Sequence, residues 1–141
     1  MGTVVRMTTK IVIGADIAPT KSNYTLFENG DVIELIGNQL QNILNNADFR
    51  IFNLEVPLTD IAAPINKYGP CLIAPAKAIT AIKNMGIDFL TLANNHILDQ
   101  GEQGLKSTME VLETNGIAYS GVGKNLTEAA KAYTKEINGI K

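Results

Sequence analysis

Apolar residues follow two alternating patterns along this chain. Short continuous runs, rich in β-branched or aromatic residues and of a length typical of buried strands, occupy 9–16, 49–56, 87–93 and 117–121. Between them, apolar residues recur three or four positions apart, as on one face of a helix, over 35–46, 76–85 and 103–115. In the first of these helices we expect Ile36, Leu40, Ile43, Leu44 and Ala47 to form the apolar face. Strand and helix alternate, which predicts one layered α/β domain over 1–141, with helices flanking a largely parallel sheet.

Glycine, proline and asparagine mark the ends of these elements. Pro75 suits the start of the second helix, while Gly86 and Gly116 end the second and third. Asn125 and Glu128 form a capping pair for a short helix over 126–131. The polar stretch between the first strand and the first helix is predicted to be mostly loop.

The last ten residues, "AYTKEINGIK", have the pattern of a strand, an Asn-Gly turn and the first residues of a returning strand. A hairpin interrupted in its second arm indicates a domain that is incomplete in this chain. An incomplete sheet leaves an exposed edge, through which a homodimer could form.

Charge and composition remove several classes of function. The net charge is −2, so there is no basic field to hold a nucleic-acid backbone. The single cysteine, Cys71, excludes an intramolecular disulfide. No apolar run approaches the roughly 18 residues that span a bilayer, and the opening "MGTVVRMTTK" lacks the apolar core of a secretion signal.

Polar side chains follow three successive predicted strands. Asp16 ends the first strand, Asn53 and Glu55 end the second, and Asn94, Asn95 and the chain's only histidine, His96, follow the third. Parallel strands bring their carboxyl ends to one edge of a sheet, where ligands bind. Carboxylate and amide oxygens with one imidazole favour a divalent metal site.

Each of these residues also has a purely structural interpretation. In that interpretation Asp16 caps a turn after its strand, Asn53 and Glu55 satisfy backbone groups, and Asn94 and Asn95 are good turn formers. His96 is then a partly buried residue held by its neighbours, and Asp99 caps the following helix. Cys71 with His96 allows a Cys–His nucleophile, although a packed or idle thiol is the simpler interpretation. The stretch "GVGKN" lacks the residues of a phosphate-binding loop.

Three segments, "FNLEVPLT" (52–59), "GIDFLTLANNHILDQGEQGLKSTMEVLETNGI" (86–117) and "GVG" (121–123), resemble the bacterial capsule-synthesis CapA family. That family includes the poly-γ-glutamate synthesis component and belongs to the calcineurin-like metallophosphatase superfamily. The resemblance covers most of the chain, and the long segment around His96 is its most specific part. It implies a metallophosphatase-like sheet.

The resemblance also implies a role for each candidate residue. Asp16, Glu55 and Asn95 would bind metal, and His96 would stabilise the transferred phosphoryl group or protonate the leaving oxygen. The remaining candidates, Asn53, Asn94 and Asp99, would support them. The implied cofactor is a divalent Mn, Fe or Zn ion, with two in a complete centre.

This chain departs from the family pattern in three ways. The family has Gly immediately before the first aspartate, whereas here Ala15 separates Gly14 from Asp16. Metallophosphatases carry Asp-x-His at the first site, where this chain has Asp16-Ile17-Ala18. The later histidine motifs that complete the metal centre are absent from a chain with one histidine, so on its own it would be weakly active or inactive.

The expected function is therefore metal-dependent hydrolysis of a phosphoester, or a related role in handling poly-γ-glutamate. The alternative is a non-catalytic component of the capsule machinery that binds an anionic polymer. The resemblance favours the cell envelope, in contact with membrane-associated capsule machinery.

Overall fold

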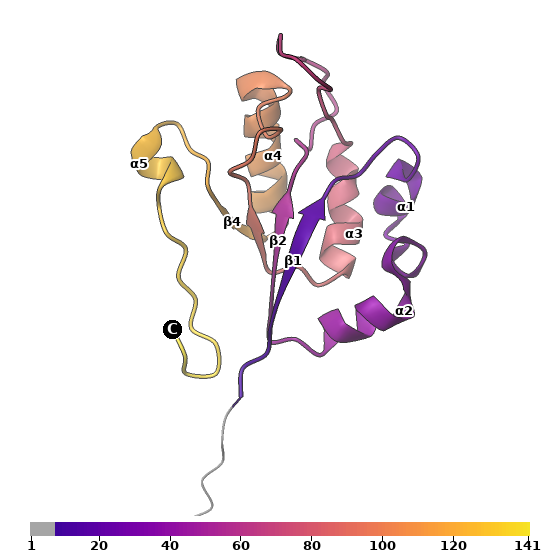
Figure 1. Cartoon of the computed structure of the whole chain (residues 1–141), viewed down its shortest axis with the longest axis vertical. Helices are drawn as coiled ribbons and strands as arrows, with labels where there is room; N and C mark the ends of the chain where they lie inside the picture. Colours follow the sequence, from indigo (N-terminus) through magenta and orange to yellow (C-terminus); the bar gives the residue numbers. More distant parts are fainter. Residues whose placement is uncertain (1–7) are drawn as a thin grey trace, which may run out of the picture.

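The structure, a computed structural model, describes residues 8–141 and contains one parallel sheet. The four strands are hydrogen-bonded in sequence order, and every neighbouring pair is parallel (Figure 1). They are β1 (Ile11–Ile17), β2 (Phe49–Leu54), β3 (Phe89–Thr91) and β4 (Ala118–Ser120). The predicted α/β class and parallel sheet are confirmed.

Helices connect the strands, as parallel pairing requires. In Figure 1, α1, α2 and α3 lie on one side of the sheet, and α5 with the C-terminal segment lies on the other. The helices are α1 (Tyr24–Asn29), α2 (Val32–Asn45), the 3₁₀ turn η1 (Ala76–Ala78), α3 (Ile79–Asn84), α4 (Gly101–Thr114) and α5 (Leu126–Ala129).

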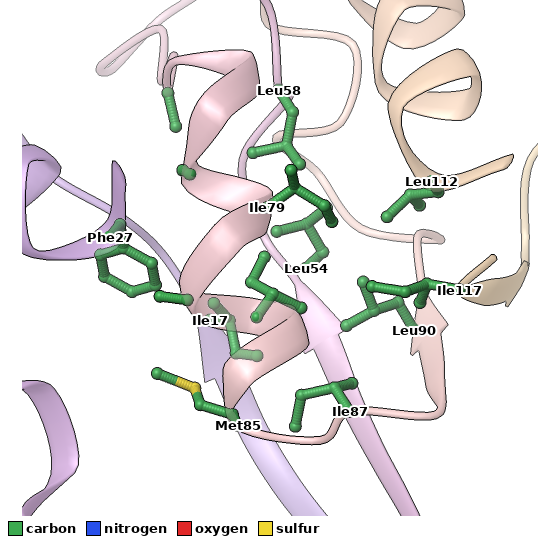
Figure 2. Packing of buried hydrophobic residues seen from close by; sticks show 14 of the residues in the cluster. Ile17, Phe27, Leu54, Leu58, Ile79, Met85, Ile87, Leu90, Leu112 and Ile117 are labelled. Carbon is green, nitrogen blue, oxygen red and sulfur yellow. The ribbon is translucent and has the colours of Figure 1, made fainter. Parts of the chain in front are cut away.

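The hydrophobic core lies between the sheet and α3, with α1 and α4 at its margins (Figure 2). Leu54 and Leu90 reach it from neighbouring strands and are fully buried. Ile82 of α3 and Leu112 of α4 are equally buried. Full burial of one such side chain stabilises the fold by about 1.5–3 kcal/mol, so this layer fixes the positions of the strand ends.

The opposite face of the sheet is only partly covered. Phe49 and Phe89 project from it, and the ring of Tyr133 stacks on both, with centroid separations of 6.5 and 4.9 Å. Farther along this face toward the β1 edge, Ile13 is 76% exposed. The C-terminal segment is therefore held against the sheet by aromatic packing.

The predicted loop between β1 and the first helix is wrong, because 17–34 contains the short helix α1 and the start of α2. Helix α1 buries only Phe27 and ends at Gly30, whose φ of 75° permits the left-handed C-cap. With one buried residue, α1 has too little apolar periodicity to be recognised in the sequence.

The apolar face predicted for 35–46 is also partly wrong. Leu44 and Ala47 are buried, but Leu40 and Ile43 are exposed. Gly37 has φ 75° and ψ 162°, which breaks the helical path inside α2. The second half of α2 therefore contacts the core only through its end.

The strand predicted at the start of "AYTKEINGIK" is wrong, while the Asn-Gly turn is confirmed. Asn138 and Gly139 both have positive φ, and Ile137 and Ile140 exchange backbone hydrogen bonds of 2.8 and 2.9 Å around them. The residues before the turn do not form a strand, because Tyr133 packs on the face of the sheet instead of pairing at its edge.

Within residues 8–141, no helix is long and apolar enough to cross a membrane. Residues 1–7, which belong to the opening segment assessed above for a secretion signal, lie outside the described part of the chain.

Candidate functional site

Three strand ends are joined through the side chain of Asn53. In the sheet register, Asn53 lies opposite Asp16 of β1 and Thr91 of β3. Asn53 Nδ2 donates to Asp16 Oδ1 at 2.7 Å, and Thr91 Oγ1 donates to Asn53 Oδ1 at 3.0 Å. A register shift between Ile13 and Asp16 precedes this contact. The structure therefore brings Asp16 and Asn53 together, and Asn53 acts as the bridge.

Asn94 shapes the loop that follows β3. Its Nδ2 donates to the carbonyl of Leu54 at 2.8 Å and to Asn53 Oδ1 at 3.3 Å. Its Oδ1 accepts from the backbone N–H groups of His96 and Ile97, both at 3.0 Å. Because its amide donor and its acceptor are both engaged inside the protein, Asn94 is a supporting residue that fixes the backbone position of His96.

The neighbouring Asn95 differs from Asn94. Its side chain is exposed, and only its backbone carbonyl has a hydrogen bond to another side chain among the described residues. Of the two asparagines, Asn95 therefore has the amide that can meet a ligand.

His96 is paired with Asp99. The His96 Nδ1 and Asp99 Oδ2 atoms are 2.7 Å apart, and the Asp99 side chain is completely buried. Two acceptors do not approach this closely, so Nδ1 carries the proton and donates to the carboxylate. In the neutral ring the lone pair is then on Nε2. Asp99 thereby decides which nitrogen of His96 can accept or release a proton in a reaction.

Three groups donate to the Asp99 carboxylate. The Leu72 N–H donates to Oδ2 at 2.6 Å, alongside His96, and the Lys67 ammonium contacts Oδ1. Burial alone raises the pKa of Asp99, but hydrogen bonds from Lys67, His96 and Leu72 outweigh it, and the pKa lies below its ordinary value. The carboxylate is therefore ionised. Its oxygens do not cap α4, whose N-cap is Gln100.

A proline-rich loop over 59–73 is fastened to this segment. Gln100, which is buried, accepts from the Ala63 N–H at 2.8 Å and donates to the Leu72 carbonyl at 2.9 Å. The Ile65 N–H donates to the Asp99 carbonyl at 3.0 Å. No sequence pattern singles out Lys67 and Gln100, because neither follows a strand and neither belongs to a periodic pattern.

Glu55 directly follows β2, and its N–H donates to the Ile17 carbonyl at 3.1 Å. Asp16, Glu55 and Asn95 offer the carboxylate and amide oxygens that divalent ions accept. Among the described residues, however, no group of three or more His, Cys, Asp or Glu side chains is arranged to hold a metal ion. The donor types fit a divalent metal, but their number falls short of a complete centre, and metal binding by these residues stays a prediction.

Beside Asn95 lies an open cleft of about 560 Å³. Gly121, with φ 96°, forms part of its wall and lies directly against Ala93. The lining of the cleft is mostly apolar and consists of Ala93, Asn94, Asn95, Ile97, Leu98, Leu105, Gly121, Val122, Gly123 and Ala129.

Cys71 was the other candidate nucleophile in the sequence. Its thiol donates a hydrogen bond to the Ile65 carbonyl at 3.3 Å.

A family model described as "Bacterial capsule synthesis protein PGA_cap" matches residues 10–141 of this chain. The match includes every described strand and helix and all of the candidate site residues.

Several proteins of known sequence are similar to the chain over shorter regions. An uncharacterized protein of Sinorhizobium fredii is 28% identical over 135 residues, which are 86% of this chain and 29% of that protein. The capsule biosynthesis protein CapA of Bacillus anthracis is 31% identical over 70 residues, 50% of this chain and 17% of that protein. A probable polyglutamine synthesis accessory protein of Mycobacterium tuberculosis is 32% identical over 85 residues, 60% of this chain and 22% of that protein. The matched region is thus under a third of each relative's length.

Proposed function

Since the chain belongs to the bacterial capsule synthesis PGA_cap family, we propose that it supplies part of a metal-dependent, phosphoesterase-type hydrolase site used in making a capsule or poly-γ-glutamate. The observation that carries this proposal is the His96–Asp99 pair, which leaves Nε2 as the reactive nitrogen at the carboxyl edge of the sheet. The bridged Asp16 lies at the same edge.

In this proposal each residue has one task. Asp16, Glu55 and Asn95 hold a divalent Mn, Fe or Zn ion, which when bound polarises phosphoryl oxygens and lowers the pKa of a coordinated water. His96 delivers a proton from Nε2 to the leaving oxygen, and buried Asp99 stabilises the imidazolium before that transfer. Asn53 and Asn94 keep the strand ends in register, so that the ligands and the imidazole stay aligned.

The decisive experiment is an assay of bis-p-nitrophenyl phosphate hydrolysis with added Mn²⁺ or Zn²⁺. The protein assayed should contain this region and be as long as the relatives that it matches. We expect metal-dependent turnover that falls about 10²-fold or more in His96→Ala, the usual contribution of a general acid. Lys106→Met changes an exposed side chain on α4 and serves as the matched surface control. Equal turnover in wild type and His96→Ala would remove His96 from the mechanism.

A second proposal keeps the capsule role named for the family and for the Bacillus anthracis relative, without a hydrolase site in this region. On this view the region is a non-catalytic component that holds an anionic polymer for the membrane-associated capsule machinery at the cell envelope. It predicts binding of poly-γ-glutamate that survives removal of divalent ions by EDTA. Loss of binding in EDTA would favour the metal site instead.

A further inference from the structure

Lys67 is unusual among the lysines because it is largely buried. Its side chain is 20% exposed, whereas that of Lys106 is 79% exposed. Lys67 comes from the loop over 59–73, far in sequence from the residues it touches. Burying an ammonium is unfavourable unless acceptors surround it, so its surroundings show what it does.

The Lys67 ammonium has three neighbours, all in the segment that follows β3. It contacts Asp99 Oδ1, donates to the Asn95 carbonyl at 3.3 Å, and lies 3.4 Å from His96 Nδ1. Because Nδ1 already carries a proton directed at Asp99, it is not the acceptor of the ammonium. The ammonium is therefore held by the Asp99 carboxylate and the Asn95 carbonyl.

The two oxygens of Asp99 consequently have different partners. Oδ1 receives Lys67, while Oδ2 receives the Leu72 N–H and His96 Nδ1. Without Lys67, Oδ1 would be a buried anionic oxygen with no hydrogen-bond donor. Rotation of the carboxylate, or a hydrogen bond from a water molecule, would then lower its free energy. Either change would weaken the contact between Oδ2 and Nδ1.

We propose that Lys67 is a positioning residue for His96: by occupying Asp99 Oδ1 and the Asn95 carbonyl, it keeps Oδ2 on Nδ1 and leaves Nε2 as the reacting nitrogen. The loop over 59–73 thus sets the tautomer of the imidazole through its contacts with Asp99. The role of this tautomer in proton transfer rests on the proposed function, but the assignment of the tautomer does not.

His96 is the only histidine in the sequence, so its ring nitrogens give a single set of signals in ¹⁵N NMR spectra. At a pH where the ring is neutral, the wild-type protein should show the Nδ1–H tautomer in large excess. Lys67→Met should reduce the ratio of Nδ1–H to Nε2–H about tenfold, the effect of one net hydrogen bond. Lys67→Arg should restore the excess, and Lys106→Met should leave it unchanged.

An unchanged tautomer ratio in folded Lys67→Met would overturn the proposal. If Lys67→Met does not fold, the wild-type protein still decides: a nuclear Overhauser contact between the Lys67 ε-methylene and the His96 ring is expected, and its absence overturns the proposal. Neither measurement uses metal or substrate. A failed phosphoesterase assay beside a Lys67-dependent tautomer would therefore reject the proposed function and leave the role of Lys67 intact.

Discussion

Thr108 shows how one buried hydroxyl can hold two segments together. Its Oγ1 accepts from the Leu58 N–H at 2.9 Å and donates to the Gly104 carbonyl at 2.7 Å. The side chain is fully buried, so neither partner has water as a substitute. This single group ties the chain leaving β2 to α4, and α4 begins beside the Asp99–Gln100 pair.

Thr108→Val keeps the shape of the side chain and removes the hydroxyl. The Leu58 N–H is then left without its acceptor, and we expect the free energy of unfolding to fall by about 1–3 kcal/mol. Urea denaturation measures the change. Thr114→Val, at the exposed end of the same helix, should change it by less than about 0.5 kcal/mol. Equal effects of the two substitutions would contradict the assigned role of Thr108.

Asp99 gives a prediction with a defined pH dependence. Its pKa in the fold is lowered, so the ionised form stabilises the fold above its unfolded value of about 3.9, and this contribution is lost as pH falls through the folded pKa. Asp99→Asn should lower the free energy of unfolding by about 3–5 kcal/mol near neutral pH, because it leaves Lys67 unpaired. The difference from wild type should shrink below about pH 3.9.

Denaturation curves of both proteins between pH 3 and 7 provide the measurement. Asp60→Asn, which changes an exposed carboxylate in the same loop region, is the matched control and should lower the free energy of unfolding near neutral pH by less than about 0.5 kcal/mol. A difference between wild type and Asp99→Asn that stays constant with pH would show that Asp99 stabilises the fold through packing rather than charge.

The sequence predicted the location of the candidate residues better than their connections. Asp16 and Asn53 lie in the last residues of their strands, and Asn94 and His96 follow a third strand. Parallel strands necessarily gather those ends at one edge. The contact between Lys67 and Asp99 depends on the path of an irregular loop, which no local pattern encodes. The same holds for the two bonds made by Gln100.

At the scale of elements, prediction succeeded where an apolar run, a helical period or a capping pair marks the element in the sequence. All four strands were found, although β3 and β4 are shorter than their apolar runs because strand pairing stops before the apolar residues do. Asn125 caps α5, accepting from the Glu128 N–H at 3.0 Å as its sequence spacing predicts. Helix α1 was missed because its single buried residue, Phe27, produces no helical periodicity of apolar residues in the sequence.

The turn after β4 depends on a close approach between two backbones. A Cβ built on Gly121 would lie 2.7 Å from Ala93 Cβ and 2.8 Å from the Ala93 nitrogen, at a φ of 96°. Gly121→Ala should therefore destabilise the fold by more than the roughly 1–2 kcal/mol of left-handed strain alone, and should shift the wall of the cleft beside Asn95.

Gly69→Ala is the matched control for this prediction. Gly69 has a φ of 89°, but a Cβ there meets nothing within 4 Å. Its substitution should show the backbone strain without the collision. Thermal melts of the two variants compare these contributions directly, and equal shifts in melting temperature would mean that the contact with Ala93 relaxes freely.

At the scale of the whole molecule, the sheet has two unequal faces. One carries the packed core of Leu54 and Leu90, and the other carries Phe49, Phe89 and the exposed Ile13. The candidate site lies at the carboxyl edge shared by both faces, so its ligands are positioned by the core on one side only. The sequence predicted the layers, but alternation along the strands did not reveal what covers the second face.

Tyr133 is the main aromatic contact on that second face, so its removal tests how the C-terminal segment is held. Tyr133→Ala removes stacking on Phe49 and Phe89, and we expect a loss of about 1–3 kcal/mol in the free energy of unfolding, from lost area and ring contact together. Exposure of the two phenylalanines should also increase binding of the dye ANS by the folded protein. Tyr68→Ala, which changes a fully exposed tyrosine, should do neither. If Tyr133→Ala matches Tyr68→Ala in both measurements, the C-terminal segment is not anchored by this ring, and Phe49 and Phe89 are exposed to solvent in the folded chain.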